Sequence, residues 1–139
     1  MSLIAKLQFG DNGFHRYAKE YLVTEYESHV ARRHNEARPD SSPKCDYLEL
    51  TVVAPGREDL NLYEWYVDHS PMNGRILIEL STPSQNQASE WKEVLFENGI
   101  CFSLGEEYHI DTLSRRSLHL KVAVEQLTVN RIILSGKWA

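Results

Sequence analysis

The chain has 139 residues, of which 42% are hydrophobic and 25% charged, a size and composition typical of one globular domain and not of a disordered or fibrous chain. Its formal net charge of -5 argues against a basic nucleic-acid-binding protein. No apolar run approaches the ~20 residues that cross a bilayer, and the N-terminus lacks a charged segment followed by an apolar one. We therefore expect one cytoplasmic domain over residues 1–139, with no membrane insertion and no nucleic-acid partner.

Apolar and polar residues alternate along most of the chain, which is the pattern of half-buried strands. The alternation is clearest in residues 118–125, where every even-numbered position is aliphatic. In chain order, strands are expected over residues 3–9, 17–26, 45–54, 75–80, 94–104, 118–125 and 130–135.

The longest of these strands crosses an Asn-Gly pair at residues 98–99. Large apolar residues keep the same parity on both sides of it, which predicts one continuous strand with a bulge at Gly99 and not a hairpin. Together with the other strands, this predicts a core of Leu48, Leu50, Val52, Ile76, Ile78, Phe96, Ile100, Phe102, Leu118, Leu120, Val122 and Val124.

One segment, residues 58–69, has a helical pattern, with acids at its start and with Pro71 and Gly74 after its end. Its expected buried face consists of Leu62, Trp65, Tyr66 and His69, at three- and four-residue steps. Many strands and one helix predict a mainly β fold, an antiparallel two-sheet β-barrel with one flanking α-helix. Two long polar connections, residues 31–44 and 81–90, join its elements.

Motifs for catalysis and cofactor binding are missing from the sequence. It has no G-x-S-x-G turn and no glycine-rich phosphate loop. The adjacent acids Glu106 and Glu107 diverge, and His29 and His34 fall on opposite faces of a strand, so neither pair predicts an acid/base or metal site. Cys45 and Cys101 stand alone, without a partner at metal spacing. We expect no enzyme activity, no cofactor and no metal.

The connection over residues 31–44 is basic although the protein is acidic. It is either a solvated loop or a surface that meets phosphate or the acidic groups of a second copy. With the tryptophan near the C-terminus, it supplies the candidate subunit-contact residues Arg32, Arg33, His34, Arg38, Lys44 and Trp138.

The order of several short motifs resembles the tube proteins of bacterial type VI secretion systems, called Hcp or TssD, in the form found in Bacteroidetes. Residues 1–9 resemble the family's opening strand, residues 37–42 (ARPDSS) its first long loop and residues 48–52 its third strand. Further motifs are the helix segment LYEW at residues 62–65, EVLFENG at residues 93–99 and the Lys-Trp pair at residues 137–138. The resemblance spans nearly the whole chain.

This resemblance implies an Hcp-like barrel that forms hexameric rings, which stack into a hollow tube expelled into target cells with effectors in its lumen. It implies contacts with type VI sheath, spike and baseplate proteins, secretion without a signal peptide, and a contact between rings through residues 31–44. The alternatives are a divergent tube paralogue that carries effectors, a barrel that binds a small ligand, and a hydrolase effector. The bulky strand residues and the missing catalytic motifs disfavour the last two.

Overall fold

The computed structural model describes residues 4–31, 44–56, 58–80, 90–109, 115–130 and 132–136. Within these residues, every expected strand is present, together with one additional strand and one helix. The elements are β1 (Ile4–Asp11), β2 (Arg16–Ala31), β3 (Lys44–Val53), α1 (Asn61–Asp68), β4 (Met72–Leu80), β5 (Glu90–His109), β6 (Arg115–Ala123), β7 (Gln126–Val129) and β8 (Ile132–Gly136).

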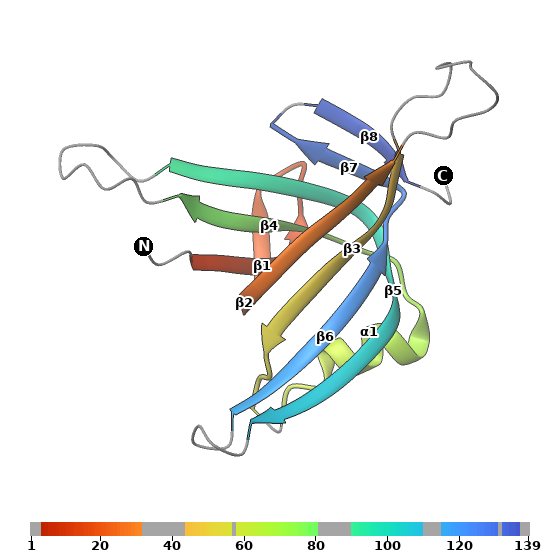
Figure 1. Ribbon diagram of the computed structural model, residues 1–139. Helices are drawn as coiled ribbons and strands as arrows, with labels where there is room; N and C mark the ends of the chain where they lie inside the picture. Colours follow the sequence, from red (N-terminus) through yellow and green to blue (C-terminus); the bar gives the residue numbers. More distant parts are fainter. Residues whose placement is uncertain are drawn as a thin grey trace.

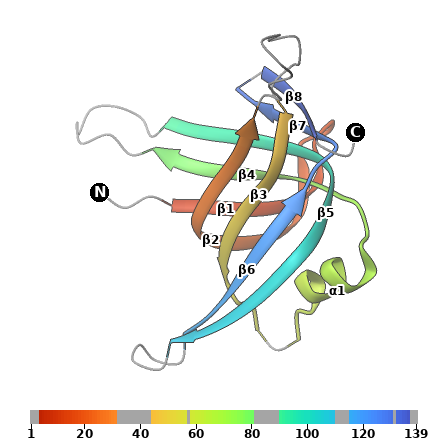
Figure 2. The same cartoon turned by 45° about the vertical axis from the view of Figure 1, so that its right-hand side comes forward.

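The strand pairings close on themselves. In the order β2-β1-β4-β5-β6-β3, each strand pairs antiparallel with the next, and β3 pairs back onto β2. The β7–β8 hairpin joins this cycle, since β7 pairs with β5 and β8 pairs in parallel with the start of β3. Figures 1 and 2 show the resulting curled sheet, with α1 beside the bend of β5. The expected antiparallel, mainly β fold with a flanking helix is confirmed.

Two long strands turn the corners of this sheet. The N-terminal part of β2 pairs with β1 and its C-terminal part with β3, and the register shifts between Val23 and Glu25. Likewise, β5 pairs first with β4 and then with β6 (Figure 1). Bulges bend a strand and increase its twist, so these irregularities let single strands run through two differently oriented parts of the one sheet.

In the middle of β5, the prediction of which residues face the core is wrong. Phe102 is 45% exposed and Ile100 only half-buried, whereas Gly99 and Cys101 are buried. The cause is an extra residue at the Asn-Gly pair, where Asn98 has a φ of 50° and the register with β4 shifts. A one-residue shift exchanges the inner and outer faces of everything that follows.

A second register shift in β5, between Cys101 and Ser103, reverses the first. Leu104 therefore packs against the core again, with the parity that the alternating pattern predicts. The other ten predicted core residues are buried as expected: Leu48, Leu50, Val52, Ile76, Ile78, Phe96, Leu118, Leu120, Val122 and Val124.

Helix α1 is shorter than predicted, because it begins at Asn61 and not at residue 58. Asp59 precedes it, and its carboxylate accepts a hydrogen bond from the Asn61 backbone N–H at 3.1 Å and one from the Tyr21 hydroxyl at 2.9 Å. Trp65 is buried on the helix, and its indole N–H donates to the Gly99 carbonyl of β5 at 2.9 Å. This bond attaches the helix to the bulged segment of β5.

The predicted buried face of the helix is only half correct. Leu62 and Trp65 are buried, whereas Tyr66 is 37% exposed and His69 is exposed. His69 has a φ of 51° and lies beyond the last helical residue, so the helical period does not extend to it. None of the described helical segments is long and apolar enough to span a membrane.

Candidate functional site

The predicted subunit-contact residues lie almost entirely outside the described part of the chain. Arg32, Arg33, His34, Arg38 and Trp138 all fall there. Lys44 begins β3, where its backbone pairs with Ala31 of β2 and with Ser135 of β8. The role of these residues in subunit contacts remains a prediction.

The described residues place a second group of polar side chains on one sheet face. After the shift in β2, its odd-numbered residues point away from the core, as do alternate residues of β3 and β6. The strand register arranges them in two neighbouring rows, Glu27–Glu49–Lys121 and Glu25–Thr51–His119.

These rows border an open pocket of about 360 Å³ on the outside of the barrel. Acidic, basic and hydroxyl groups line it, together with the edge of the core. Its lining residues are Glu25, Tyr26, Glu27, Glu49, Leu50, Thr51, Ser103, Gly105, His119, Leu120 and Lys121.

One row forms a hydrogen-bonded chain of a hydroxyl, an imidazole and a carboxylate. Thr51 Oγ1 lies 2.9 Å from His119 Nδ1, and His119 Nε2 lies 2.7 Å from Glu107 Oε2. Catalysis of acyl transfer would also require N–H donors for the developing oxyanion. Thr51 is in the middle of β3, which pairs with β2 on one side and β6 on the other, so the sheet ladder uses the neighbouring N–H groups. The chain of bonds therefore orients side chains without forming a hydrolase site.

The adjacent acids of β5 diverge, as their sequence positions predict. Glu107 pairs with His119, whereas Glu106 accepts a hydrogen bond from the Tyr63 hydroxyl at 2.6 Å and lies 3.3 Å from Arg116 Nε. The hydrogen bond to Glu106 is the main reason why the pKa of Tyr63 is raised. Glu106 thus links β5 to α1 and β6, and the two acids do not act on a common group.

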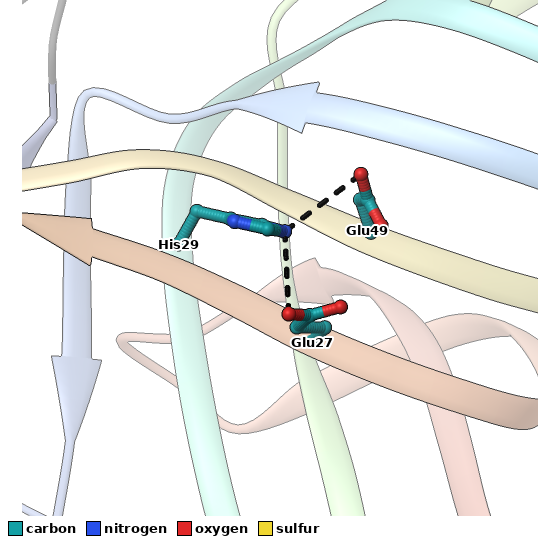
Figure 3. A group of neighbouring side chains, drawn as sticks. All are labelled: Glu27, His29 and Glu49. Atoms are coloured by element: carbon teal, nitrogen blue, oxygen red, sulfur yellow. Dashed lines mark ion pairs between the residues drawn. The ribbon is translucent and has the colours of Figure 1, made fainter.

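The other row contains the cluster shown in Figure 3, in which His29 of β2 lies between Glu27 and Glu49. His29 Nε2 is 3.7 Å from Glu27 Oε1 and 3.7 Å from Glu49 Oε1. The imidazole stacks on Tyr47, with ring centroids 4.2 Å apart. Lys121 Nζ lies 3.9 Å from the same Glu49 Oε1 atom.

The sequence pattern did not predict this cluster. Glu27 and His29 are two residues apart, which places them on one face of a strand, but nothing local indicates that Glu49 is their neighbour. The cluster follows from the register of β2 with β3, in which Glu27 lies directly opposite Glu49.

Cys101 is a free thiol inside the barrel. Burial raises the pKa of this thiol to about 11. A protonated, buried thiol is a poor nucleophile and a poor metal ligand, so Cys101 is a small core residue, in agreement with its sequence context.

Several large apolar side chains are exposed among the described residues, and two of the places where they occur lie far apart on the barrel. On β8, Ile132 and Ile133 are each 64% exposed. Near the other end of the molecule, Leu60, Tyr66 and Val67 are exposed on α1 and its approach (Figure 1). Grouped apolar residues of this kind mark surfaces that bind another protein chain.

The chain matches the family "Hemolysin coregulated protein Hcp (TssD)" over residues 1–139. No curated protein sequence matches it.

Solved structures with the same fold are described as Hcp proteins. Hcp1 from Flavobacterium johnsoniae has a TM-score of 0.70 and 14% identity, and the match covers 95% of this chain and 98% of that one. Hcp1 from Salmonella typhimurium has a TM-score of 0.63 and 11% identity, with 91% and 85% covered. The "secreted protein Hcp3" from Pseudomonas aeruginosa has a TM-score of 0.60 and 10% identity, with 91% and 88% covered. These likenesses extend over whole chains and concern the fold.

Proposed function

The chain belongs to the Hcp (TssD) family of type VI secretion tube proteins, which are structural proteins and not enzymes, and on this premise we propose that it forms hexameric rings. These rings stack into the hollow inner tube of the machine and carry effectors in the lumen. The observation that carries the proposal is the family match over the whole chain, on a fold shared with Hcp structures.

The packed interior supports a structural role over ligand binding. Bulky aliphatic and aromatic side chains from all sides of the barrel fill it, including Leu48, Ile76, Phe96, Leu118 and Leu120. A ligand-binding barrel needs an interior cavity, and the pocket of about 360 Å³ lies on the outside. A filled barrel is rigid, which suits a subunit that is stacked and pushed as part of a tube.

The exposed apolar side chains support assembly into a ring. A closed ring joins two different surfaces of each subunit, since the contact is head to tail. Ile133 of β8 supplies one apolar contact, and Leu60 and Val67, beside and on α1, supply another. Burial of both between neighbouring subunits removes them from water.

The remaining partners follow from the same proposal. Stacked rings contact the sheath on their outside and the spike and baseplate at their ends, and the protein leaves the cell through the type VI machine. The basic residues 31–44 supply the contact between rings. None of these roles requires a cofactor.

The experiment that tests the ring is sedimentation of the purified protein over a range of concentrations, with negative-stain images of the same samples. Rings of six subunits are the expected species. Ile133→Lys should shift the mass toward the monomer, because it places a charge in the proposed contact, whereas Ile133→Val should leave the rings intact. A wild-type protein that remains monomeric at high concentration would contradict the proposal.

A further inference from the structure

We propose that Glu27, His29 and Glu49 form a binding site for a divalent transition-metal cation such as Zn²⁺, one site per subunit (Figure 3). The proposal adds a metal site to a face for which the sequence predicts none. It does not depend on ring formation, because all three ligands belong to one chain.

The spacing of the three ligand atoms fits a metal better than hydrogen bonds. His29 Nε2 lies 3.7 Å from each of the two Glu Oε1 atoms, beyond the ~2.7–3.2 Å of a hydrogen bond. Ligands at ~2.0–2.2 Å from a tetrahedral zinc ion lie roughly 3.3–3.6 Å from one another. All the ligand atoms are within 4.8 Å of one another, so small side-chain rotations bring them to one ion.

The imidazole nitrogen that faces the carboxylates is buried and has no hydrogen-bond partner. Stacking on Tyr47, with an angle of 18° between the rings, holds the imidazole in this orientation. Buried polar atoms in proteins nearly always have a partner, so an unpaired one indicates a group that the site accommodates. A metal ion bound to the Nε2 lone pair supplies that partner.

The charges around the imidazole also favour a cation. Glu27 and Glu49 are directly opposite on paired strands, where like charges repel. Lys121 Nζ lies 3.9 Å from the same Glu49 Oε1 atom that faces His29, but its row position is across β3 from Glu27. A divalent ion between the two carboxylates offsets their repulsion directly.

The set of ligand atoms selects the class of metal. Imidazole nitrogen suits Zn²⁺ and its neighbours in the first transition series, whereas Ca²⁺ and Mg²⁺ prefer sites made of oxygen atoms. Three protein ligands leave a fourth position for water, and the Glu27 side chain, 66% exposed, leaves the site open to solvent. The bound ion cross-links β2 to β3 and should raise the unfolding temperature.

The test uses the full-length, tag-free protein after treatment with a chelator. Thermal unfolding and equilibrium dialysis are measured with ZnCl₂ and, separately, with MgCl₂. We expect one zinc ion per chain, a rise in the unfolding temperature with zinc, and none with magnesium. Co²⁺ in place of zinc should give the visible absorption of a nitrogen- and oxygen-ligated ion.

Conservative variants identify the ligands. His29→Gln, Glu27→Gln and Glu49→Gln should each weaken zinc binding about tenfold or more. Glu27→Gln is the decisive variant if another fails to fold, because Glu27 is the most exposed of the three. His119→Gln, which changes an imidazole in the neighbouring row, is the matched control and should bind zinc as the wild type does.

Lys121→Met provides a test in the opposite direction. Removal of the ammonium group beside Glu49 should strengthen zinc binding, because that group repels the ion and competes for the carboxylate. The proposal is overturned if zinc does not bind the wild type. It is overturned equally if Glu27→Gln and Glu49→Gln bind zinc undiminished, or if His119→Gln loses it as His29→Gln does.

Discussion

At the scale of single residues, hydrogen bonds compensate the burial of polar side chains such as Asn12 and Thr51. Asn12, in the turn between β1 and β2, is the clearest polar case. Its amide nitrogen donates to the carbonyls of Gly74 and Phe96 at 3.0 and 3.1 Å, and its oxygen accepts from the Tyr17 hydroxyl at 2.7 Å. One buried amide thus joins the turn to β4 and β5, and the cost of removing it from water is offset by these bonds.

Leu120 of β6 tests the apolar core. Its side chain is 1% exposed and lies in the centre of the barrel wall. Leu120→Ala removes buried methyl groups and leaves a cavity, which should lower the free energy of unfolding by ~2–5 kcal/mol. Chemical denaturation measures this loss. A denaturation midpoint of Leu120→Ala equal to that of the wild type would show that the Leu120 side chain is not buried in solution.

The hydroxyl of Tyr21 makes the stability of the folded protein depend on pH in the alkaline range. The pKa of its hydroxyl is raised from 10.0 to about 12, mainly by burial and also by Asp59, which accepts its hydrogen bond. The folded protein therefore holds this proton more tightly than the unfolded chain. The stabilisation is complete below the unfolded pKa of 10.0 and is lost as the pH rises through about 12.

Tyr21→Phe isolates this effect from other groups that titrate in the same range. The variant should be less stable than the wild type at about pH 8, because it lacks the bond to Asp59. The difference should narrow between about pH 10 and about pH 12, where only the wild type loses this contribution. Urea denaturation at several pH values measures both curves. If the difference in unfolding free energy between the wild type and Tyr21→Phe stays constant with pH, the raised pKa of Tyr21 is not its cause.

At the scale of elements, β5 shows how one long strand pairs with β4 in one part of the sheet and with β6 in another. The extra residue near Asn98 moves Gly99 and Cys101 to the inside, and the second shift brings Leu104 back to the core. Between the two shifts, the Gly99 carbonyl accepts a hydrogen bond from the indole N–H of Trp65 in α1. A side chain at this position would crowd Phe96 and Val122, since an added Cβ would lie 3.0 Å from one and 3.1 Å from the other and these side chains would have to shift slightly.

Asn98 is the residue that permits this bend. Its φ of 50° is in the left-handed region, which asparagine tolerates and β-branched residues do not. Asn98→Val should therefore lower the free energy of unfolding by ~1–3 kcal/mol through backbone strain. Asn98→Gly, which accepts the same φ but loses the hydrogen bond to Glu125, should cost less. Chemical denaturation of the two variants measures the loss of unfolding free energy in each. A smaller loss for Asn98→Val than for Asn98→Gly would refute backbone strain as the cause of the destabilisation.

At the scale of the whole molecule, the proposed tube needs contacts between rings as well as within them. Residues Arg32, Arg33 and Arg38 belong to the connection between β2 and β3, and arginine pairs bidentately with carboxylates. The net charge of -5 means that acids are abundant on a neighbouring copy. Exposed ion pairs of this kind are worth ~0–1 kcal/mol each and are screened within ~8–10 Å, so stacking should weaken as salt rises.

Replacement of all three arginines with glutamate should reduce the stacking of rings at low salt, as counted in electron micrographs. Replacement of the same arginines with lysine keeps the positive charge but removes the bidentate pairing, so it separates simple charge attraction from bidentate hydrogen bonding. Glutamate variants that stack as readily as the wild type would show that the connection is only solvated.

The sequence by itself determined seven of the eight described strands, most of the core and the family. Alternation of residues such as Leu118, Leu120 and Val122 indicates a buried face whatever strand lies beside it, because successive side chains on a strand point to opposite faces. The buried half of the helix, Leu62 and Trp65, follows equally from local spacing. Short motifs in order were sufficient to indicate the Hcp (TssD) family, which the match over residues 1–139 confirms.

The sequence indicated a bulge at Gly99, but only the tertiary structure decided which residues of β5 face the core beyond it and which strands are neighbours. The bulges of β5 depend on its pairing with two other strands, so Ile100 and Phe102 could not be placed from their own parity. The polar cluster likewise required the β2–β3 register, which joins Glu27 and His29 to Glu49 of a distant segment. Local pattern sets which face of a strand is apolar, whereas long-range pairing sets which side chains meet across it.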